Sequence, residues 1–487
     1  MAEEGKVKIG LEVHCQLTSL KTKLFCSCSS DYRGKPPNTN VCPVCLGLPG
    51  SLPVLNKKAV EYAVMVALAL NCKPAKMTIF ARKNYFYPDL PKNFQISQYD
   101  LEGFEPLASN GYVTFTVNKK KKTVKIRRIH LEEDPGKLYH PGGLGFAPYT
   151  LIDYNRSGIA LLEIVTEPDF TAPAEARSFL QKLRSTLEHL GVFDGSLEGS
   201  MRCDANVSVE GGGRVEVKNI SSFKDVERAL SYEVVRQREL LKKGVKVRME
   251  TRHWDEVRRI TVSLRVKEEE KDYRYFMEPD LCPVTIDEDF VRRIKIQMPE
   301  LPDARKERFI NQYGLPEYDA EVLVADRSLA DFFEDCVKIY GKPKPIANWL
   351  MGDFLQCLYS LDVSVKDCKV TPKHLAEMLS LMDDGVISIK IAKKVLWEMM
   401  KTGKPASTII EEKGWRRISD MNVIEAVTEK IFKENEKAVK DALVDEKAIN
   451  FLVGKIMEAT KGMADPALTN KIVRDKLSRL KERLQLN

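Results

Sequence analysis

Alternating apolar and polar residues in the first half of the chain predict strands, and the clearest strand runs from Lys6 to Leu17. Successive side chains of a strand point to opposite sides. The apolar side chains of this run therefore share one face: Val7, Ile9, Leu11 and Val13. Glu12 and His14 project side by side from the polar face. A carboxylate and an imidazole in one space can act as a pair of cation ligands. A hydrogen-bonded surface pair is the alternative.

A second strand is predicted from Thr123 to Ile129, and the chain becomes strongly acidic beyond it. Three consecutive carboxylates, Glu132, Glu133 and Asp134, follow His130, and basic residues stand on both sides. We interpret this run as a strand end that enters a loop, with its acidic side chains gathered at one spot. Unpaired charges in the interior cost several kcal/mol. The run is therefore either a solvated acidic turn or a site for a divalent cation that carries a phosphate.

The pattern continues with an apolar strand from Ile159 to Val165, interrupted by Glu163. Helical spacing of apolar residues predicts one amphipathic helix from Lys57 to Asn71 and another helix from about Pro173 to Leu190. Strands and helices are therefore mixed along this part of the chain.

A β-hairpin is predicted around three glycines at 211–213, because the run 201–209 alternates and the next strand places Glu216 on its polar side. A hairpin symmetric about the glycines would set Ser208, not Asp204, opposite Glu216. Asp204 and Glu216 therefore converge only if a bulge or a third strand helps.

Four cysteines form two pairs across a loop: Cys26 and Cys28, then Cys42 and Cys45 after thirteen residues rich in Pro, Asn and Gly. Two such pairs are typical of a small tetrahedral zinc site. The second pair has the usual knuckle spacing, and the first is tighter. Because four thiolates leave no open position, the metal would be structural rather than catalytic. The alternative is four ordinary reduced cysteines.

Basic residues, aromatic residues and two prolines alternate from Arg82 to Gln95. Prolines stiffen such a loop, aromatic rings can stack on a base, and cations can meet phosphates. The alternative is an aromatic loop that covers the core. The glycine-rich run from His140 to Ala147 matches neither GxGxxG before a helix nor GxxxxGK[ST]. We interpret it as a mobile loop rather than a phosphate loop.

Helical patterns replace strand patterns from about Pro299 to the end, with a second change near Gly403 to Pro405. The last helix is predicted from Thr469 to Leu484. Its exposed side is basic: Lys471, Arg474, Lys476, Arg479, Lys481 and Arg483. A basic helical tail is usually a solvated face, but with an RNA partner it would contact the nucleic-acid backbone.

Composition narrows the class of protein. The 487 residues allow two or three domains, and 43% hydrophobic with 30% charged residues indicate a globular chain. No apolar run reaches the length of about 18 residues that a transmembrane helix needs, and the first residues lack a signal peptide. We therefore expect a cytoplasmic protein without a membrane partner, whose eleven cysteines are thiols or metal ligands. The net charge of +7 permits a polyanionic partner.

Taken together, these residues resemble the GatB/GatE family, whose B members belong to tRNA-dependent Asp/Glu amidotransferases. The resemblance covers nearly the whole chain, and several motifs in one order are far more specific than any single one. The motifs are Gly10 to His14, Arg82 to Gln98, His130 to Lys137, Asp153 to Asp169, Arg202 to Asn206, Val217 to Asn219, Asp272 to Phe276, Asn348 to Gly352 and Ala459 to Gly462.

Small departures accompany the resemblance. Met277 stands where the family usually has proline, and Pro135 where many members have alanine. Some members lack the four cysteines, so zinc is not needed for the family's chemistry. E-type members carry a large inserted domain for which this chain has no room, so the resemblance is to the B type.

The resemblance implies an enzyme that acts on tRNA misacylated with Asp or Glu. The B-type protein would use ATP and Mg²⁺ to phosphorylate the side-chain carboxylate. Ammonia released from glutamine or asparagine by a partner A subunit would then give Asn-tRNA or Gln-tRNA, and a small C subunit would complete a heterotrimer. Phosphoryl transfer needs mainly positioning and charge neutralisation. This agrees with a sequence in which we find no nucleophilic dyad.

The resemblance also implies site residues. The implied Mg²⁺ ligands are Glu12, His14, Glu133, Asp204 and Glu216. Only the motif, and not the chemistry of the residues, distinguishes Glu133 from Glu132. The expected cations on the nucleotide side are Arg82, Lys83 and Lys92. Structural Zn²⁺ is expected at Cys26, Cys28, Cys42 and Cys45.

The implied fold is α+β. A large cradle domain (1–298) on a mostly antiparallel sheet, with a zinc-binding insertion at 26–45, would precede an all-helical domain (299–404) and a small YqeY-like helical tail (405–487) that binds tRNA. The alternative from another class is a non-catalytic zinc-containing RNA-binding scaffold. The carboxylates distinguish the two, because a pure binder of polyanions avoids acidic groups near its RNA face.

Overall fold

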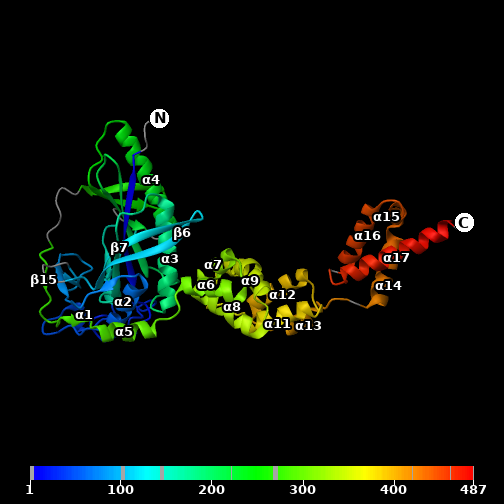
Figure 1. Cartoon of the computed structure of the whole chain (residues 1–487), viewed down its shortest axis with the longest axis horizontal. Coiled ribbons are helices and arrows are strands. Elements are labelled where there is room, and N and C mark those ends of the chain that lie inside the picture. Colours follow the sequence, from blue (N-terminus) through cyan, green and yellow to red (C-terminus); the bar gives the residue numbers. More distant parts are fainter. Residues whose placement is uncertain are drawn as a thin grey trace. The chain divides into compact units, whose positions relative to one another are not determined.

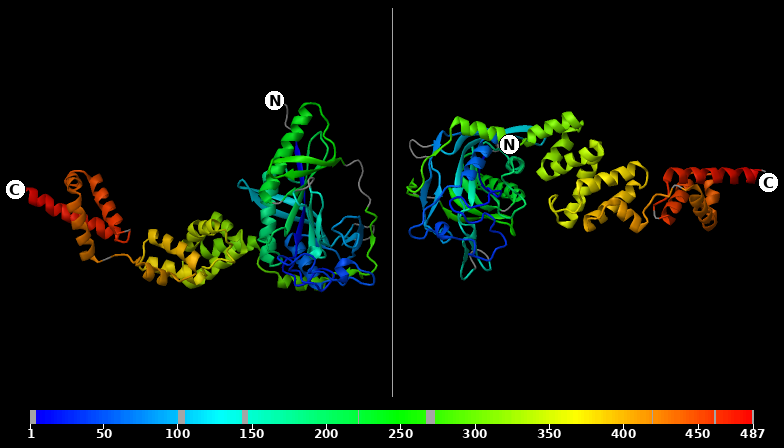
Figure 2. Two further views of the ribbon diagram at one scale, coloured as in Figure 1. Left: turned by 180° about the vertical axis from the view of Figure 1, so that it is seen from behind. Right: turned by 90° about the horizontal axis from the view of Figure 1, so that it is seen from below.

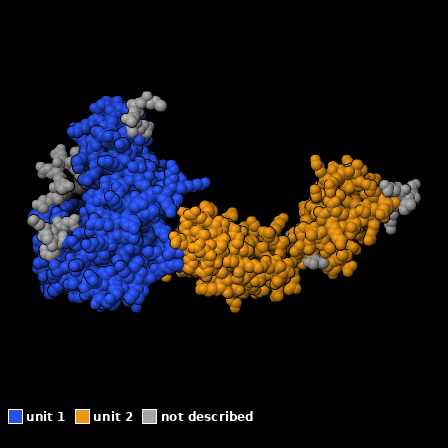
Figure 3. Space-filling view, in the orientation of Figure 1, with its two compact units in different colours: residues 1–305 blue, residues 306–487 orange. Residues whose placement is uncertain are grey.

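The computed structural model describes residues 5–99, 105–142, 147–220, 222–266, 273–418, 420–460 and 462–485. It divides into two compact units, residues 1–305 and residues 306–487 (Figure 3). Asp272 and Lys461 of the family motifs, and residues 143–146 of the glycine-rich run, lie outside the described residues. The sheet-based first unit and the helical second unit confirm the predicted α+β class.

A nine-stranded sheet forms the centre of the first unit. Every neighbouring pair is antiparallel except β12 and β13. In spatial order the strands are β14 (Ile260–Val266), β13 (Glu250–Asp255), β12 (Val215–Ile220), β11 (Met201–Val209), β1 (Val7–Gln16), β10 (Ala160–Thr166), β7 (Lys120–Glu133), β6 (Ala108–Val117) and β2 (Lys73–Pro74).

The strand predicted from Thr123 to Ile129 is part of β7, which continues through Glu133. Its pairing with β10 persists to the end, where Glu133 lies opposite Ala160. The expectation of a loop that gathers all the acidic side chains at one spot is therefore wrong. Because the run stays extended, Glu132 and Glu133 point to opposite sides.

Helices cover the apolar face of this sheet. Their buried residues join those of the strands in one core, and α3 and α4 run alongside the sheet (Figures 1 and 2). The helices of this unit are α1 (Pro43–Leu46), α2 (Lys57–Ala69), α3 (Pro173–Leu190), α4 (Phe223–Lys242), α5 (Glu288–Gln297) and the start of α6 (Pro302–Tyr313). The opposite face of the sheet is left to polar side chains.

A small three-stranded sheet packs against the end of β7. Its strands are β15 (Phe276–Met277), β4 (Ala81–Asn84) and β5 (Phe94–Ser97). Gln98 accepts a hydrogen bond from the backbone of Leu131 at 2.8 Å, and Gln95 donates one to the backbone of Glu133 at 2.7 Å. Two further strand pairs are β3 (Met77–Thr78) with β16 (Val284–Thr285), and β8 (Lys137–Tyr139) with β9 (Leu151–Asp153), which precedes the 3₁₀ turn η1 (Tyr154–Arg156).

The second unit is helical. Its helices are the rest of α6, α7 (Glu317–Val324), α8 (Arg327–Tyr340), α9 (Pro343–Trp349), the π-helical turn η2 (Leu350–Phe354), α10 (Leu355–Leu361), α11 (Pro372–Asp383), α12 (Ile389–Thr402), α13 (Ala406–Lys413), α14 (Met421–Glu434), α15 (Glu436–Ala442), α16 (Glu446–Ala459) and α17 (Pro466–Gln485). Buried apolar residues form one cluster within 309–410 and smaller clusters within 424–477. No described helix is long and apolar enough to cross a membrane.

The predicted last helix begins at Pro466 rather than at Thr469. The side chain of Asp465 accepts hydrogen bonds from the backbone N–H groups of Ala467 and Leu468 at 2.8 and 3.1 Å. Such a cap satisfies donors that the first turn leaves open, and proline suits the first helical position.

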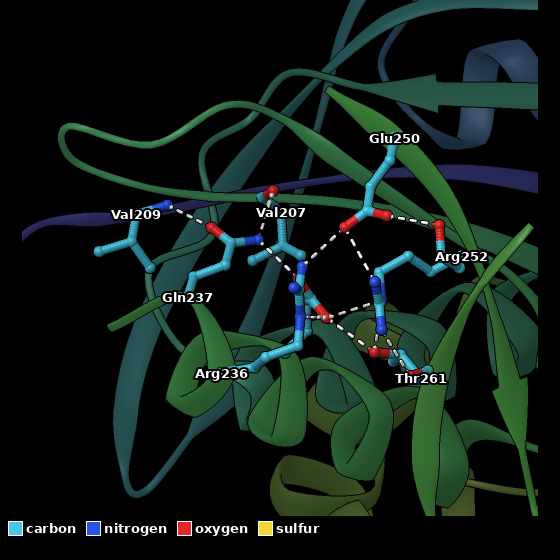
Figure 4. Close-up of polar contacts among 9 residues, drawn as sticks. Val207, Val209, Arg236, Gln237, Glu250, Arg252 and Thr261 are labelled. Atoms are coloured by element: carbon cyan, nitrogen blue, oxygen red, sulfur yellow. Dashed lines mark hydrogen bonds and ion pairs between the residues drawn. The ribbon is translucent and has the colours of Figure 1, made fainter. Parts of the chain in front are cut away.

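A buried charge network holds the β13–β14 end of the sheet to α4. Glu233 of α4 is fully buried and accepts hydrogen bonds from Arg236 and Thr261. Arg252 lies 3.6 Å from the same carboxylate and 2.9 Å from Glu250 (Figure 4). Two guanidinium groups and two carboxylates thus balance their charges where a helix meets the last strands.

We expect Glu250→Gln to lower the stability of this unit by about 1–3 kcal/mol at pH 7, because charge-assisted hydrogen bonds are lost. Burial alone would raise the pKa of Glu250, but the hydrogen bond from Ser263 and the charge of Arg252 hold it below its usual range. A lowered pKa stabilises the fold above the unfolded value of about 4.3, and this contribution is lost as the pH falls below it. The deficit of the variant should therefore persist from pH 7 to about pH 5 and narrow below about pH 4.

The measurement is amide hydrogen exchange of α4 and β13 at several pH values, analysed as opening free energies. Glu239→Gln is the matched control, since Glu239 is exposed on the same helix and should change stability by less than about 0.5 kcal/mol. Equal protection of the Glu250→Gln variant and the unmodified protein at pH 7 would contradict the role given to this network.

Candidate active site on the polar face of the sheet

Five adjacent strands bring charged side chains together on the face that the helices leave open. The register sets Glu12 opposite Asp204, His14 opposite Glu163, and Glu163 opposite His130. Residues far apart in the sequence therefore meet because core packing on the other face fixes the pairing of the strands.

His14 lies at the centre of a carboxylate cluster. Its Nε2 atom is 3.5 Å from Glu12 Oε1, 3.8 Å from Glu132 Oε1 and 4.0 Å from Glu163 Oε2. The ligand atoms of Glu12, His14 and Glu163 all lie within 4.8 Å of one another, so one ion could contact all three.

Burial and neighbouring charges shift the pKa values of the carboxylates in this cluster. Burial and the nearby Glu163 carboxylate raise the pKa values of Glu12 and Glu132. Burial also acts on Glu163, but His130 and His14 hold its pKa below the usual range. Arg128, 3.3 Å from Glu163, supplies part of the positive charge. A divalent cation would favour the ionised forms of Glu12 and Glu132, and oxygen ligands are those that Mg²⁺ prefers. The donor set therefore fits a divalent cation.

Asp204 and Glu216 converge beside this cluster. The register sets Asn206 rather than Ser208 opposite Glu216, and a bulge follows between Ala205 and Cys203, next to Asp204. Lys218 donates a hydrogen bond to Asp204 at 2.6 Å and lies 3.2 Å from Glu216. An ammonium group thus joins the two carboxylates.

Glu133 is not brought to His14. On the other side of β7 it pairs with Lys92 and accepts a hydrogen bond from the backbone N–H of Ile96 at 2.9 Å. Glu132 and Glu163 lie beside His14 instead. Glu163 lies within the Asp153–Asp169 motif, but the resemblance did not imply it as a ligand. The one signal for it is an acidic residue that interrupts an apolar strand.

The three expected cations divide between two cavities. Arg82 is 2.7 Å from Glu278 and 3.2 Å from Asp280, and it lines a cavity of about 340 Å³ together with Lys92. Lys83 lines a different cleft, of about 260 Å³, together with Glu12. Burial alone would lower the pKa of Lys83, but Glu132 and the neighbouring carboxylates raise it above its ordinary value.

A buried ion pair fixes the end of the polar face. Asp134 is 1% exposed; it accepts hydrogen bonds from Arg202 at 2.7 Å and from Gln16 at 2.6 Å. Burial would raise its pKa, but Arg202 and Arg156 hold it below the usual range. The carboxylate thereby ties the end of β7 to β1 and β11.

The four predicted cysteine ligands come together. Their sulfur atoms all lie within 4.8 Å of one another: Cys26, Cys28, Cys42 and Cys45. Lys23, which is fully buried, donates to Cys45 Sγ at 3.6 Å and to the backbone oxygen of Asn40 at 2.9 Å. A hydrogen bond from Cys26 lowers the pKa of Cys45 to about 4. A thiolate, its ammonium partner and three more sulfurs fit a closed metal site.

The aromatic loop does not simply cover the core. Phe86 is 74% and Tyr87 is 57% exposed, whereas Tyr85 packs edge to face on Tyr273 at 5.8 Å. The aromatic residues that line the cleft come from other segments: Tyr99, Tyr273 and Tyr275.

The sequence matches two known protein families. Residues 7–292 match the GatB/GatE catalytic domain, and residues 331–477 match the GatB domain. The chain therefore belongs to the GatB/GatE family.

Similar proteins include the B subunit of the aspartyl/glutamyl-tRNA(Asn/Gln) amidotransferase of Sulfurisphaera tokodaii, which is 54% identical over 96% of this chain and 98% of the relative. The proteins of the same name from Carboxydothermus hydrogenoformans and Thermotoga maritima are each 51% identical. These alignments cover 98% and 96% of this chain, and 100% and 97% of the relatives.

Proposed function

We propose that this chain is the B subunit of an ATP-dependent aspartyl/glutamyl-tRNA amidotransferase, a ligase that forms a C–N bond. It phosphorylates the side-chain carboxylate of misacylated Asp-tRNA(Asn), Glu-tRNA(Gln) or both, and ammonia then converts the acyl phosphate into an amide. The observation that carries this proposal is the cluster of Glu12, His14 and Glu163, two of which (Glu12 and Glu163) line a cleft, in a chain that belongs to the GatB/GatE family.

Phosphoryl transfer requires that the site position the two reactants and neutralise the charge of the phosphate oxygens. Glu12, His14 and Glu163 would hold Mg²⁺, which supplies positive charge to the phosphate oxygens of ATP, and Glu132 lies beside His14. Asp204 and Glu216 stand next to them and complete the acidic side of the site.

The chain's own cations act on the transferred group. Lys83 and Lys218 line the same cleft and can contact anionic oxygens as the phosphoryl group moves. The attacking group is the side-chain carboxylate of the aminoacyl-tRNA, which is ionised at neutral pH. It needs no general base, so the site can work with carboxylates, one imidazole and ammonium groups.

Partner subunits follow from the same proposal. Relatives carry the name of a B subunit, and we propose a glutaminase A subunit that releases ammonia from glutamine, and a small C subunit, in a cytoplasmic heterotrimer.

Glu133 and Lys92, which the resemblance placed with the Mg²⁺ ligands and the nucleotide-side cations, lie away from the carboxylate cluster. They line the cavity that Cys26 and Cys45 also line.

The helices after residue 405 are proposed as the part that binds tRNA. Helix α17 exposes Lys471, Arg479 and Lys481, whereas Arg474 and Lys476 pair with Glu446 and Glu429. Exposed cations suit phosphate contacts, which position RNA without reading its sequence. The proposed division is a cradle domain, a helical domain and this tail, and the separate buried clusters within 309–410 and 424–477 support it.

A non-catalytic zinc-containing RNA-binding scaffold is the second candidate. The acidic face weighs against it, because a surface that only binds a polyanion gains nothing from buried carboxylates that repel one another. Burial, and then the charge of Glu163, raise the pKa values of Glu12 and Glu132.

We expect Glu12→Gln to lower tRNA-dependent amide formation by at least about 100-fold, since one charge around the phosphates is removed. The affinity for tRNA should stay unchanged. The measurement is amide formation by the complete complex with both misacylated tRNAs. Glu61→Gln is the control, because Glu61 pairs with Lys58 at the surface of α2. Activity of the Glu12 variant within a few-fold of the unmodified complex would refute the assignment.

Protein purified without chelators should carry about one tightly bound zinc per chain, because four sulfurs close a tetrahedral site. Cys42→Ser should lose this zinc and lower thermal stability more than it lowers turnover. Cys282→Ser, at an exposed cysteine outside the cluster, should retain the metal. Elemental analysis that finds no zinc in the unmodified protein would count against the site.

A further inference from the structure

The cleft that contains the carboxylates has a second end built from tyrosines. Tyr99 and Tyr275 stack face to face, with ring centroids 4.0 Å apart and planes 4° from parallel. Tyr273 meets Tyr275 edge to face at 6.0 Å and meets Tyr85 at 5.8 Å. Tyr99, Tyr273 and Tyr275 line the same cleft as Glu12. One cavity thus joins an acidic end to an aromatic end.

The outermost ring of this row is open to solvent and also held in place. Tyr99 is 43% exposed although one face of its ring packs on Tyr275. Tyr275 is itself supported by Tyr273. A planar ligand that stacks on Tyr99 therefore meets a ring whose orientation is already fixed, and little further side-chain freedom is lost on binding.

A ligand that occupies both ends must carry an anionic group and a planar ring. The carboxylates would receive phosphates through the divalent cation proposed above, and the ammonium group of Lys83, which also lines the cleft, lies 5.0 Å from the centroid of the Tyr273 ring. Aromatic side chains stack well on nucleobases, because every base has a π-face. A nucleotide combines phosphate and base in one molecule. The exposed Phe86 and Tyr87 are not among the residues that line this cleft.

We infer that Tyr99, backed by Tyr275, is a stacking platform for an adenine ring. The inference rests on the proposed function and deepens it, because it assigns a base subsite to the cleft in which the phosphates are handled. Adenine can reach this cleft from two sources, ATP and the 3′-terminal adenosine of tRNA. Both present the same ring, so the test must separate them.

The test uses the full-length chain assembled with its partner subunits. Affinity is measured by equilibrium dialysis for ATP with Mg²⁺, and separately for uncharged tRNA with and without its 3′-terminal adenosine. Tyr99→Leu removes the ring and should weaken binding of one adenine-containing ligand by about 5- to 100-fold. Tyr99→Phe keeps the ring and should bind within about twofold of the unmodified complex.

The matched control is Tyr112→Leu, because Tyr112 on β6 is 48% exposed and is not among the residues that line the cleft. It should leave both affinities unchanged. Tyr275→Leu removes the supporting ring and should weaken the same ligand as Tyr99→Leu does. This second variant separates a stacking effect from a local folding defect at residue 99.

Each outcome has one interpretation. Weaker binding of ATP alone assigns the platform to the ATP base, and weaker binding only of tRNA that has its terminal adenosine assigns it to the RNA. Unchanged affinity of Tyr99→Leu for both ligands overturns the inference. Amide formation by the unmodified complex is measured in parallel. Its absence would contradict the proposed function, whereas unchanged affinities with intact amide formation would contradict the platform alone.

Discussion

Successive side chains of a strand must point to opposite faces, and five adjacent strands of this sheet obey that constraint together. Apolar residues of these strands pack with the helices, so the packing of that core selects the register of every pair. The register in turn selects which charged groups meet on the other face. Glu12 lies opposite Asp204 and His14 opposite Glu163 because Leu11 and Val13, their neighbours along β1, are packed in the core. The geometry of the candidate active site is therefore a consequence of how the core is filled.

The same constraint separates two neighbouring carboxylates into different environments. Glu132 faces the carboxylate cluster around His14 and has a raised pKa, whereas Glu133 faces away and is paired with Lys92. Charges a few ångströms apart interact strongly when water is excluded. A one-residue step along β7 thus places one carboxylate beside His14 and the next in a separate ion pair with Lys92.

Local patterns predicted the local parts of this site. The shared face of Glu12 and His14 follows from alternation within one strand, and the clustering of Cys26, Cys28, Cys42 and Cys45 follows from spacing within one loop. Contacts between residues far apart in the chain could not be predicted from local patterns. The place of Glu163 depends on the pairing of β10 with β1, the meeting of Asp204 and Glu216 at Lys218 depends on the register of β11 and β12, and Arg82 is bound by a carboxylate 196 residues away. The sequence showed that Arg82, Lys83 and Lys92 are cations. It could not show that Arg82 and Lys92 are paired with Glu278 and Glu133, whereas Lys83 lines the cleft with Glu12.

The polar face also bears on how this protein can evolve. Carboxylates such as Glu12 and Glu132, with pKa values raised by burial and mutual repulsion, weaken the folded state that contains them. Neutral replacements at such positions commonly make a protein more stable. Mutation alone would therefore tend to erode this acidic cluster, because many substitutions there would benefit the fold. The stability of the fold and the charge that the site needs for its proposed chemistry therefore place opposite demands on these positions.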